Sequence, residues 1–409
     1  MKKFKDIALG VVTAIGGFVD AGELITSAQA GAIFQWSLLW VVVVCVGLAI
    51  LFETMAARVA MATRRALFDA VRERLGFRLA LIPLLAVCAV NLLTLVAEIA
   101  GMAFALEMAT GWSFLLWAAP CALLLWLILW KGSFSLIENG ASALGMFILV
   151  FVWSALALRP PWGQIAAQMW RPDAHGQPWT LFAYSVVGLV GAYVAPYEVL
   201  FYSSGAVEEQ WGMDYLWPNR LISGIGNVLG GLVAASIIVV SALVLFPRGI
   251  QVEQIRTSAL GPIAALGMKG FWLFVAGALF CSMAAGLEVA LSATYAITEY
   301  FGWHWKKDEP PAQSAMFHLV YMLFLLAALG VVLSGLNPIK VTEAAMVFNA
   351  VALPFTLLPL LLVAGDPRYA PPPATSGPSI RLLGWLGFGV LTIVAVVGVP
   401  LFVITGGGG

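Results

Sequence analysis

Gly17-Phe18-Val19-Asp20-Ala21-Gly22-Glu23-Leu24 places two carboxylates in the middle of the first apolar segment of the chain. An ionised side chain at the centre of a bilayer costs about 2.5–3.5 kcal/mol on insertion scales, so such residues usually face a cavity and have a function there. The glycines allow a helix to open and to expose its backbone. We therefore expect the first membrane helix to be interrupted around Asp20 and Glu23.

A second stretch has the same character: Gly191-Ala192-Tyr193-Val194-Ala195-Pro196-Tyr197-Glu198 is apolar, carries glycine and proline, and ends in an acid. Two interrupted apolar segments in corresponding halves of a chain are the best sequence indication of a transporter's binding site. The pair therefore predicts a transport site between two broken helices.

The composition is that of a polytopic membrane protein. Of the 409 residues, 62% are hydrophobic and 10% are charged, whereas soluble domains carry about 25% charged residues. The 21 basic residues balance the 21 acidic ones, so charge gives no reason to expect a nucleic-acid partner. The histidines, cysteines and glycines form no metalloprotease, nucleophile-elbow or phosphate-loop motif. We therefore expect neither an enzyme nor a resident cofactor.

Hydropathy predicts about eleven spanning helices of roughly 20–28 residues. The expected spans are 6–33 (interrupted), 36–62, 79–108, 112–130, 134–158, 180–208 (interrupted), 221–246, 262–300, 314–335, 340–364 and 380–404. Because each half opens with a broken helix, we expect two inverted five-helix repeats plus one helix. The expected division is 1–158, an external linker 159–179, 180–364, and a C-terminal part 365–409 with helix eleven and a glycine-rich tail.

The basic residues predict the orientation. With the N-terminus inside, fifteen of the 21 basic residues fall on the cytoplasmic side, as the positive-inside rule requires. An odd number of helices then places the C-terminus outside, in what we expect to be a bacterial inner membrane. The stretch 64–76 is amphipathic and is expected to lie at the cytoplasmic surface.

The two interrupted segments, with several shorter motifs, resemble the Nramp (SLC11) divalent-metal transporter family along nearly the whole chain. The family's Asp-Pro-Gly-Asn appears as Asp20-Ala21-Gly22-Glu23, and its Gly-Ala-x-Val-Met-Pro-His-Asn as the stretch 191–198. The other motifs follow in the family's order: Ser27-Ala-Gln-Ala-Gly31, Ala56-Ala57-Arg58, Arg72-Glu73-Arg74, Ala97-Glu98-Ile99-Ala100-Gly101, Ser203-Ser204, Gly335-Leu336-Asn337-Pro338 and Leu353-Pro354-Phe355.

The resemblance implies a LeuT-like fold with helices one and six unwound around a metal ion. Typical members bind the ion with the Asp, the Asn, the carbonyl of the Ala and the Met sulfur. The matching positions here are Asp20, Glu23, Ala192 and Ala195. Ala195 replaces the methionine and so removes the soft sulfur ligand, and Glu23 replaces the asparagine and so adds a negative charge. Glu198, one turn after Ala195, is expected to add another.

These departures are similar to those of the Nramp-related magnesium transporters. A larger, more anionic site without sulfur suits an ion that keeps part of its water shell, as Mg²⁺ does. We therefore expect import of partly hydrated Mg²⁺ by alternating access, and of Mn²⁺ as well. Where typical members carry proton-route Asp and His, this chain has Leu95 and Tyr197. Glu98 remains, and an isolated carboxylate is a poor proton relay, so we expect transport without proton coupling.

Other interpretations stay open at this point. Glu98, Tyr197 and Asn349 are expected to support or gate the site rather than to bind the ion. For Glu198 the alternative is an interhelical hydrogen bond without contact to the ion. Glu53 and Glu288 are expected to be interhelical polar contacts. The rival functions are proton-coupled Mn²⁺ transport, a Mg²⁺ channel, an amino-acid permease and a metal sensor. The expected partners are the metal ion as substrate and the lipid bilayer, around a monomer.

Overall fold

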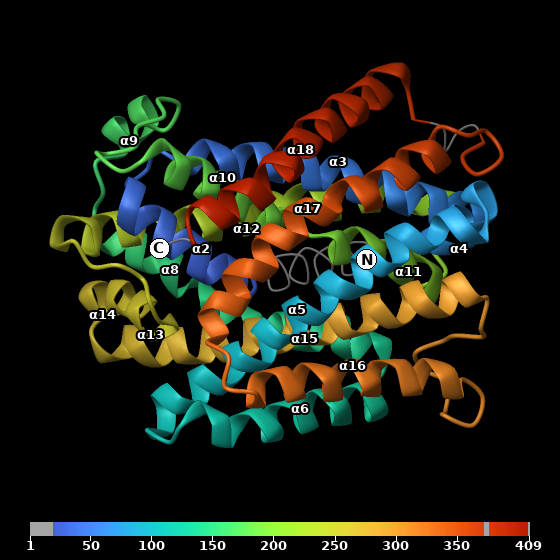
Figure 1. The fold of residues 1–409 in the computed structure, drawn as a ribbon, viewed down its shortest axis with the longest axis horizontal. Helices are drawn as coiled ribbons and strands as arrows, with labels where there is room; N and C mark the ends of the chain where they lie inside the picture. The colour runs from blue at the N-terminus through green and yellow to red at the C-terminus, as the bar shows by residue number, and fades with distance from the viewer. Residues whose placement is uncertain (1–18, 372–375, 408–409) are drawn as a thin grey trace.

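The computed structural model describes residues 19–371 and 376–407, and within them the chain forms helices and their connections, without a β-strand. The first half of the predicted first span lies outside the described residues. Its second half is α2 (Ala21–Phe34). Figure 1 shows the long helices running in roughly one direction, which is the arrangement of a membrane bundle.

Nine helical segments of the described residues are long and apolar enough to cross a membrane. They coincide with nine of the eleven predicted spans, because runs of apolar side chains of this length define both. The helices are α3 (Leu39–Thr63), α5 (Phe77–Thr110), α6 (Phe114–Lys131), α10 (Trp179–Tyr193) with α11 (Pro196–Glu208), α12 (Leu216–Val244), α15 (Met268–Phe301), α16 (Ala315–Leu333), α17 (Pro338–Ala364) and α18 (Pro378–Ile404).

The predicted fifth span, 134–158, is not one regular helix. It consists of a π-helical turn η1 (Leu136–Ala141), then α7 (Ser142–Gly145), a 3₁₀ turn η2 (Met146–Leu149) and α8 (Val150–Ala157). Its sequence contains glycines, an asparagine and serines, which are weak helix formers. Hydropathy detects the apolar length of a span and not the regularity of its backbone.

One predicted span is divided in the structure, and the predicted linker contains a helix. The expected long span 262–300 is divided at Gly267, whose φ of +63° ends α14 (Leu260–Leu266) before α15 begins. A positive φ is a conformation that glycine adopts without a Cβ clash. The expected linker 159–179 contains a helix, α9 (Trp162–Gln168), which follows α8 at a bend of 106°.

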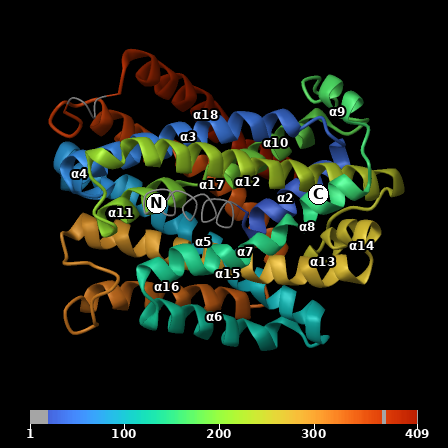
Figure 2. The same ribbon diagram turned by 180° about the vertical axis from the view of Figure 1, so that it is seen from behind.

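The helices pack around a centre formed by α2, α5, α10, α12, α15 and α17. The long helices α5 and α15 lie against each other, α2 packs against α12 and α10, and α17 contacts α5, α10 and α18. Figures 1 and 2 show α6 and α16 along one edge of the bundle and α18 along the other. The broken helices α2 and α10–α11 therefore lie inside the bundle, where their exposed backbone is covered.

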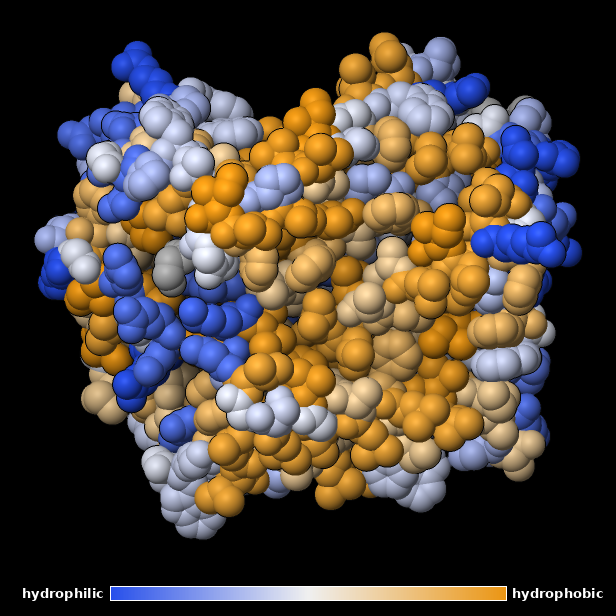
Figure 3. Space-filling model, in the orientation of Figure 1, coloured by the Kyte–Doolittle hydropathy of each residue, from blue (hydrophilic) through white to orange (hydrophobic). Residues whose placement is uncertain are grey.

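The outer surface has the distribution expected for a protein in a bilayer. Figure 3 shows apolar residues across the middle of one face and hydrophilic residues gathered at its two ends. On α18, Ile393 and Val396 expose 67% and 69% of their surface. Large aliphatic side chains this exposed are stable in contact with lipid tails.

The predicted surface helix is α4 (Leu67–Leu75). Its apolar side chains, Phe68 among them, are buried, and its first amide groups are bound by other helices. Leu67 N donates to Ser203 Oγ at 3.0 Å, and Phe68 N donates to Glu299 Oε2 at 3.3 Å. Arg74 forms an ion pair of 3.0 Å with Asp366, beyond the end of α17. The helix thus lies at one end of the bundle and is held by α11, α15 and α17.

Candidate functional site

The helix α2 begins inside the bundle, at the carboxylates that the sequence singles out. Asp20 has extended backbone angles and caps the helix, because its Oδ1 accepts a hydrogen bond from Glu23 N at 2.6 Å. Ala21 N donates to Glu98 Oε2 of α5 at 3.3 Å. The first amides of a helix lack partners within it and favour negative charge. A helix therefore begins at the predicted interruption, with two carboxylates at its start, while the segment before Val19 lies outside the described residues.

The second interruption lies between α10 and α11, at Val194 and Ala195. In a continuous helix the carbonyl of Ala192 would accept a hydrogen bond from residue 196. That residue is Pro196, which has no N–H group. The Ala192 carbonyl is therefore released from the helix, while the Ala195 carbonyl accepts from Glu198 N at 3.3 Å. This prediction of a broken helix is confirmed.

Glu23 is the least satisfied of the buried acids at this site. Its side chain is fully buried, and neither Oε1 nor Oε2 has a hydrogen-bond partner. The charges that act on it most strongly are those of Asp20, Glu198 and Glu98, all of them carboxylates. A buried charge without a partner is costly by several kcal/mol. Glu23 therefore requires either a proton or a cation from outside the protein.

Polar side chains on neighbouring helices position these carboxylates. The side chain of Tyr197 lies close to that of Asp20, and the Tyr197 carbonyl accepts a hydrogen bond from Ser292 Oγ of α15 at 3.1 Å. Ser282, also on α15, lies close to Glu98. The structure thus places Tyr197 and Glu98 beside Asp20 and the start of α2, and their supporting role stays a prediction.

Asn349 of α17 is held differently. Its Nδ2 donates weakly to Thr94 Oγ1 of α5 at 3.4 Å, and its Oδ1 is buried without a partner. The amide therefore bridges α17 to α5 and keeps an unused acceptor. Asn349 lies on α17, which contacts α2, α10 and α11, and its supporting role stays a prediction.

Glu198 is not grouped with Asp20 and Glu23 into a set of three ligands. In the part of the chain that the structure describes, no three side chains of the types His, Cys, Asp and Glu are close enough to hold one metal ion. Apart from burial, the charge that acts most strongly on Glu198 is that of Glu53 of α3, followed by that of Asp20. Glu53 accepts hydrogen bonds from Ser223 and Asn227 of α12, at 2.8 Å each. Its predicted role as an interhelical contact is confirmed.

The sequence analysis missed Met346. This fully buried residue of α17 packs against Ala192, and the end of its side chain lies beside Gly22. A methyl group added to Gly22 would overlap Met346 Sδ and Cε and would lie 3.2 Å from Asp20 Oδ1. Met346 precedes Asn349 by three residues, so both lie on one face of α17. No motif in the sequence indicated that this face meets both broken helices.

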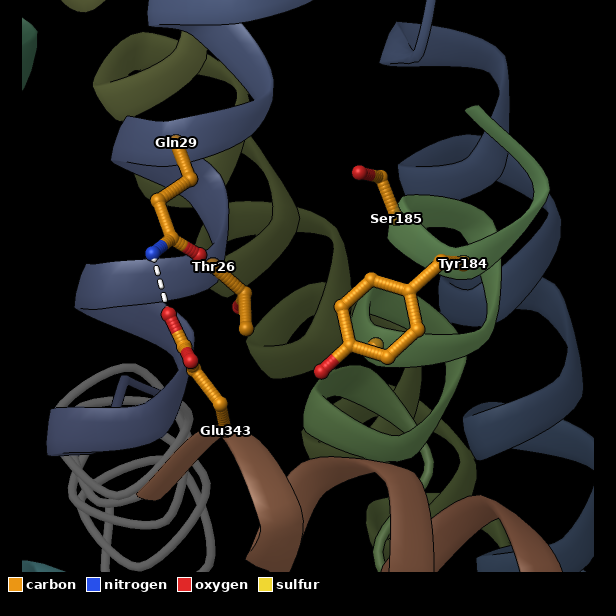
Figure 4. A pocket seen from close by; sticks show the side chains of 6 residues that line it. Thr26, Gln29, Tyr184, Ser185 and Glu343 are labelled. Atoms are coloured by element: carbon orange, nitrogen blue, oxygen red, sulfur yellow. Dashed lines mark hydrogen bonds between the residues drawn. The ribbon is translucent and has the colours of Figure 1, made fainter. Parts of the chain in front are cut away.

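A small pocket lies one to two turns along α2 from Glu23. Its lining residues are Thr26, Gln29, Tyr184, Ser185, Gly188 and Glu343. Figure 4 shows the labelled side chains of α2, α10 and α17 around this space. Gln29 Nε2 donates to Glu343 Oε1 at 2.5 Å, and the Tyr184 hydroxyl is buried without a partner. The Gln29–Glu343 hydrogen bond joins α2 to α17 on this side of the carboxylates.

Comparison with solved structures identifies the arrangement of the helices. The manganese transporter of Eremococcus coleocola, in a mutant form, superimposes with a TM-score of 0.78 at 21% identity, over 96% of this chain and 85% of that one. MhsT in complex with L-phenylalanine superimposes with a TM-score of 0.62 at 15% identity, over 97% of this chain and 98% of that one. These similarities confirm the expected fold class, an all-helical LeuT-like membrane protein with helices one and six broken.

Sequence comparison identifies the family. The chain is 25% identical over 421 residues to a divalent metal cation transporter, MntH, from Deinococcus radiodurans, which covers 97% of this chain and 89% of the relative. The family model described as natural resistance-associated macrophage protein-like, Nramp, matches residues 10–400. This is a family of integral membrane transporters of divalent metal cations and not of enzymes, and the chain belongs to it.

Proposed function

We propose that the chain imports a divalent metal cation by alternating access and binds it between the start of α2 and the break between α10 and α11. The observation that supports this most directly is Glu23, a fully buried carboxylate with two open oxygens. Asp20 and the released carbonyl of Ala192 supply further oxygens. Ala195 contributes space instead of a ligand. Glu198 adds negative charge from the adjacent turn.

For the transported ion, we propose Mg²⁺ in partly hydrated form, with Mn²⁺ as a second substrate. Carboxylate, carbonyl and water oxygens suit both ions, and Mg²⁺ is usually held by a few carboxylates with several waters. The side chain of residue 195 is a methyl group, so α11 offers no sulfur there. We also propose that entry is not coupled to protons. The inside-negative potential supplies about 2.3 kcal/mol per charge for each 100 mV.

A second candidate is proton-coupled Mn²⁺ transport. The compared relatives support manganese as the transported ion of this candidate, because they are described as divalent metal cation and manganese transporters. The structure also holds two features that this candidate uses, a buried Glu98 and the sulfur of Met346. The two candidates differ in ion preference and in proton movement, and one assay measures both.

The deciding experiment is uptake into proteoliposomes of Mg²⁺, Mn²⁺ and Ca²⁺, with a pH-sensitive dye inside the vesicles. Saturable Mg²⁺ uptake without acidification of the interior is the expected result. Mn²⁺ uptake that acidifies the interior and that Mg²⁺ does not inhibit would establish the second candidate instead. Uptake that does not saturate and that far exceeds carrier rates would indicate a channel.

For the membrane setting, we propose a monomer in the bacterial inner membrane, with the N-terminus cytoplasmic and the C-terminus outside. The distribution of basic residues supports this orientation. We further propose that 1–158 and 180–364 form the two repeats that move against each other, joined by 159–179 and followed by 365–409. In this orientation α2 leads outward from Asp20, so the pocket beside Glu343 lies on the outer side of the site.

We predict that Glu343→Ala opens this outer side. The substitution removes the acceptor of the Gln29 hydrogen bond that joins α2 to α17. A cysteine introduced at Ser185, which lines the same pocket, should then react several-fold faster with a membrane-impermeant thiol reagent. The matched control is Glu343→Gln, which keeps an acceptor oxygen and should leave the rate near that of the parent. Equal rates in all three proteins would show that this contact does not close the pathway.

A further inference from the structure

We propose that Met346 supplies a sulfur ligand to the transported ion from α17, and that this ligand raises the affinity of the site for softer divalent cations without being needed for Mg²⁺. This inference rests on the proposed divalent-cation site and assigns it one more residue. The sequence implies a site without sulfur, because residue 195 is alanine. Met346 would supply a thioether to this site from a different helix.

The position of the Met346 side chain carries the inference. Its Sδ and Cε lie against Gly22, at the place where a Cβ would stand if residue 22 had one. Asp20 Oδ1 lies 3.2 Å from that same point. The thioether and the carboxylate therefore face one small volume at the open end of α2. Because Gly22 has no side chain, the end of Met346 can reach this place.

The same side chain also reaches the second broken helix. Met346 packs against Ala192, whose carbonyl is released at the break. The backbone of α17 comes close to α10 here because Gly191 has no side chain to separate them. One sulfur is thus next to both of the segments that supply the proposed oxygen ligands. Glu23 binds Asp20 through its amide and has two buried oxygens without a partner, which is the independent sign that a cation is taken up next to Asp20.

The chemistry of a thioether fits this role. Sulfur donors favour soft and borderline metals, whereas oxygen donors favour Mg²⁺ and Ca²⁺. A methionine has three rotatable bonds and a polarisable sulfur, so its end can turn toward an ion without a backbone change. The alternative is that Met346 only fills space beside Gly22. A leucine of nearly equal volume separates the two roles, because it keeps the packing and removes the sulfur.

The test compares Met346→Leu with the parent in proteoliposomes, with Cd²⁺, Mn²⁺ and Mg²⁺ as substrates. We expect the KM for Cd²⁺ to rise about tenfold, the KM for Mn²⁺ to rise less, and the KM for Mg²⁺ to stay within about twofold. The control is Met55→Leu, because Met55 is a buried methionine of α3 that packs against Gly384 of α18. That variant should leave all three KM values unchanged.

Parallel changes for all three ions, or no change, would overturn the role of Met346 and leave divalent transport standing. If the parent neither carries nor binds any of the three ions, the proposed function is wrong and this inference with it. Should Met346→Leu be poorly folded, X-ray absorption of the parent loaded with Cd²⁺ decides the question. A sulfur neighbour of Cd²⁺ that is also found in Met55→Leu would support Met346 as a ligand. A shell of oxygen neighbours alone would contradict it.

Discussion

Replacing Glu23 by glutamine should lower divalent-metal uptake at least about a hundredfold while the protein stays as stable as the parent or becomes more stable. The carboxylate is buried, and neither oxygen has a partner within the protein. Removing one charge from a desolvated ion pair costs about 3–5 kcal/mol, and about 1.4 kcal/mol corresponds to a factor of ten. Without the ion, the same substitution removes a charge that Asp20, Glu198 and Glu98 repel.

These two opposite effects make the prediction specific. A residue that only holds the fold together would lose stability and transport at the same time. We therefore measure the initial rate of uptake in proteoliposomes and the melting temperature in detergent, on the same preparations of Glu23→Gln. A lower melting temperature together with lost uptake would identify Glu23 as a structural residue.

The matched control is Glu107→Gln. Glu107 is on α5 as Glu98 is, but about 13 Å further along the helix, and its Oε2 accepts a hydrogen bond from Phe114 N at 3.2 Å. A glutamine oxygen can accept the same bond. This variant should transport at the parent's rate, so that a loss specific to Glu23 reports on the ion site.

The start of α2 at Ala21 and the break between α10 and α11 could be predicted from the sequence because their causes are local. Pro196 removes the hydrogen bond to the Ala192 carbonyl whatever surrounds it. Asp20 is a residue type that caps helices, and its carboxylate binds an amide three residues along the same chain. The span ends are predictable for a similar reason, since apolar length alone decides which segments cross a bilayer. These features required no knowledge of which helices are neighbours.

The contacts between distant helices could not be predicted in this way. Met346 lies beside Gly22 although more than three hundred residues separate them, and Glu53 finds its partners on α12. Neither pair leaves a motif in the sequence. Ala195 stands where the family has methionine, and this indicated a site without sulfur. A motif comparison considers one helix at a time and does not show which helices are neighbours. The packing of α17 against α2 and α10 is what brings a sulfur back.

Replacing Gly191 by alanine should destabilise the protein by about 3 kcal/mol or more, the upper part of the range for overpacking a buried contact. A Cβ at this position would overlap the backbone carbonyl oxygen of Met346 and lie 2.9 Å from the amide nitrogen of Ala350. Backbone atoms in the middle of α17 cannot turn away as the end of a side chain can. The two helices would have to separate, which would move Met346 and the Ala192 carbonyl apart.

The melting temperature in detergent measures this effect, and Gly330→Ala is the matched control. Gly330 is in α16, where an added methyl group would meet no atom within 4 Å. In an open helical position the same substitution is neutral or stabilises by about 0.4–1 kcal/mol, because alanine has fewer unfolded conformations and forms helices better. A fall in melting temperature at Gly191 and none at Gly330 would show that the close contact of α10 with α17 is required. Equal stability of both variants would mean that α17 can move away from α10, and the sulfur of Met346 would then have no fixed place beside the broken helices.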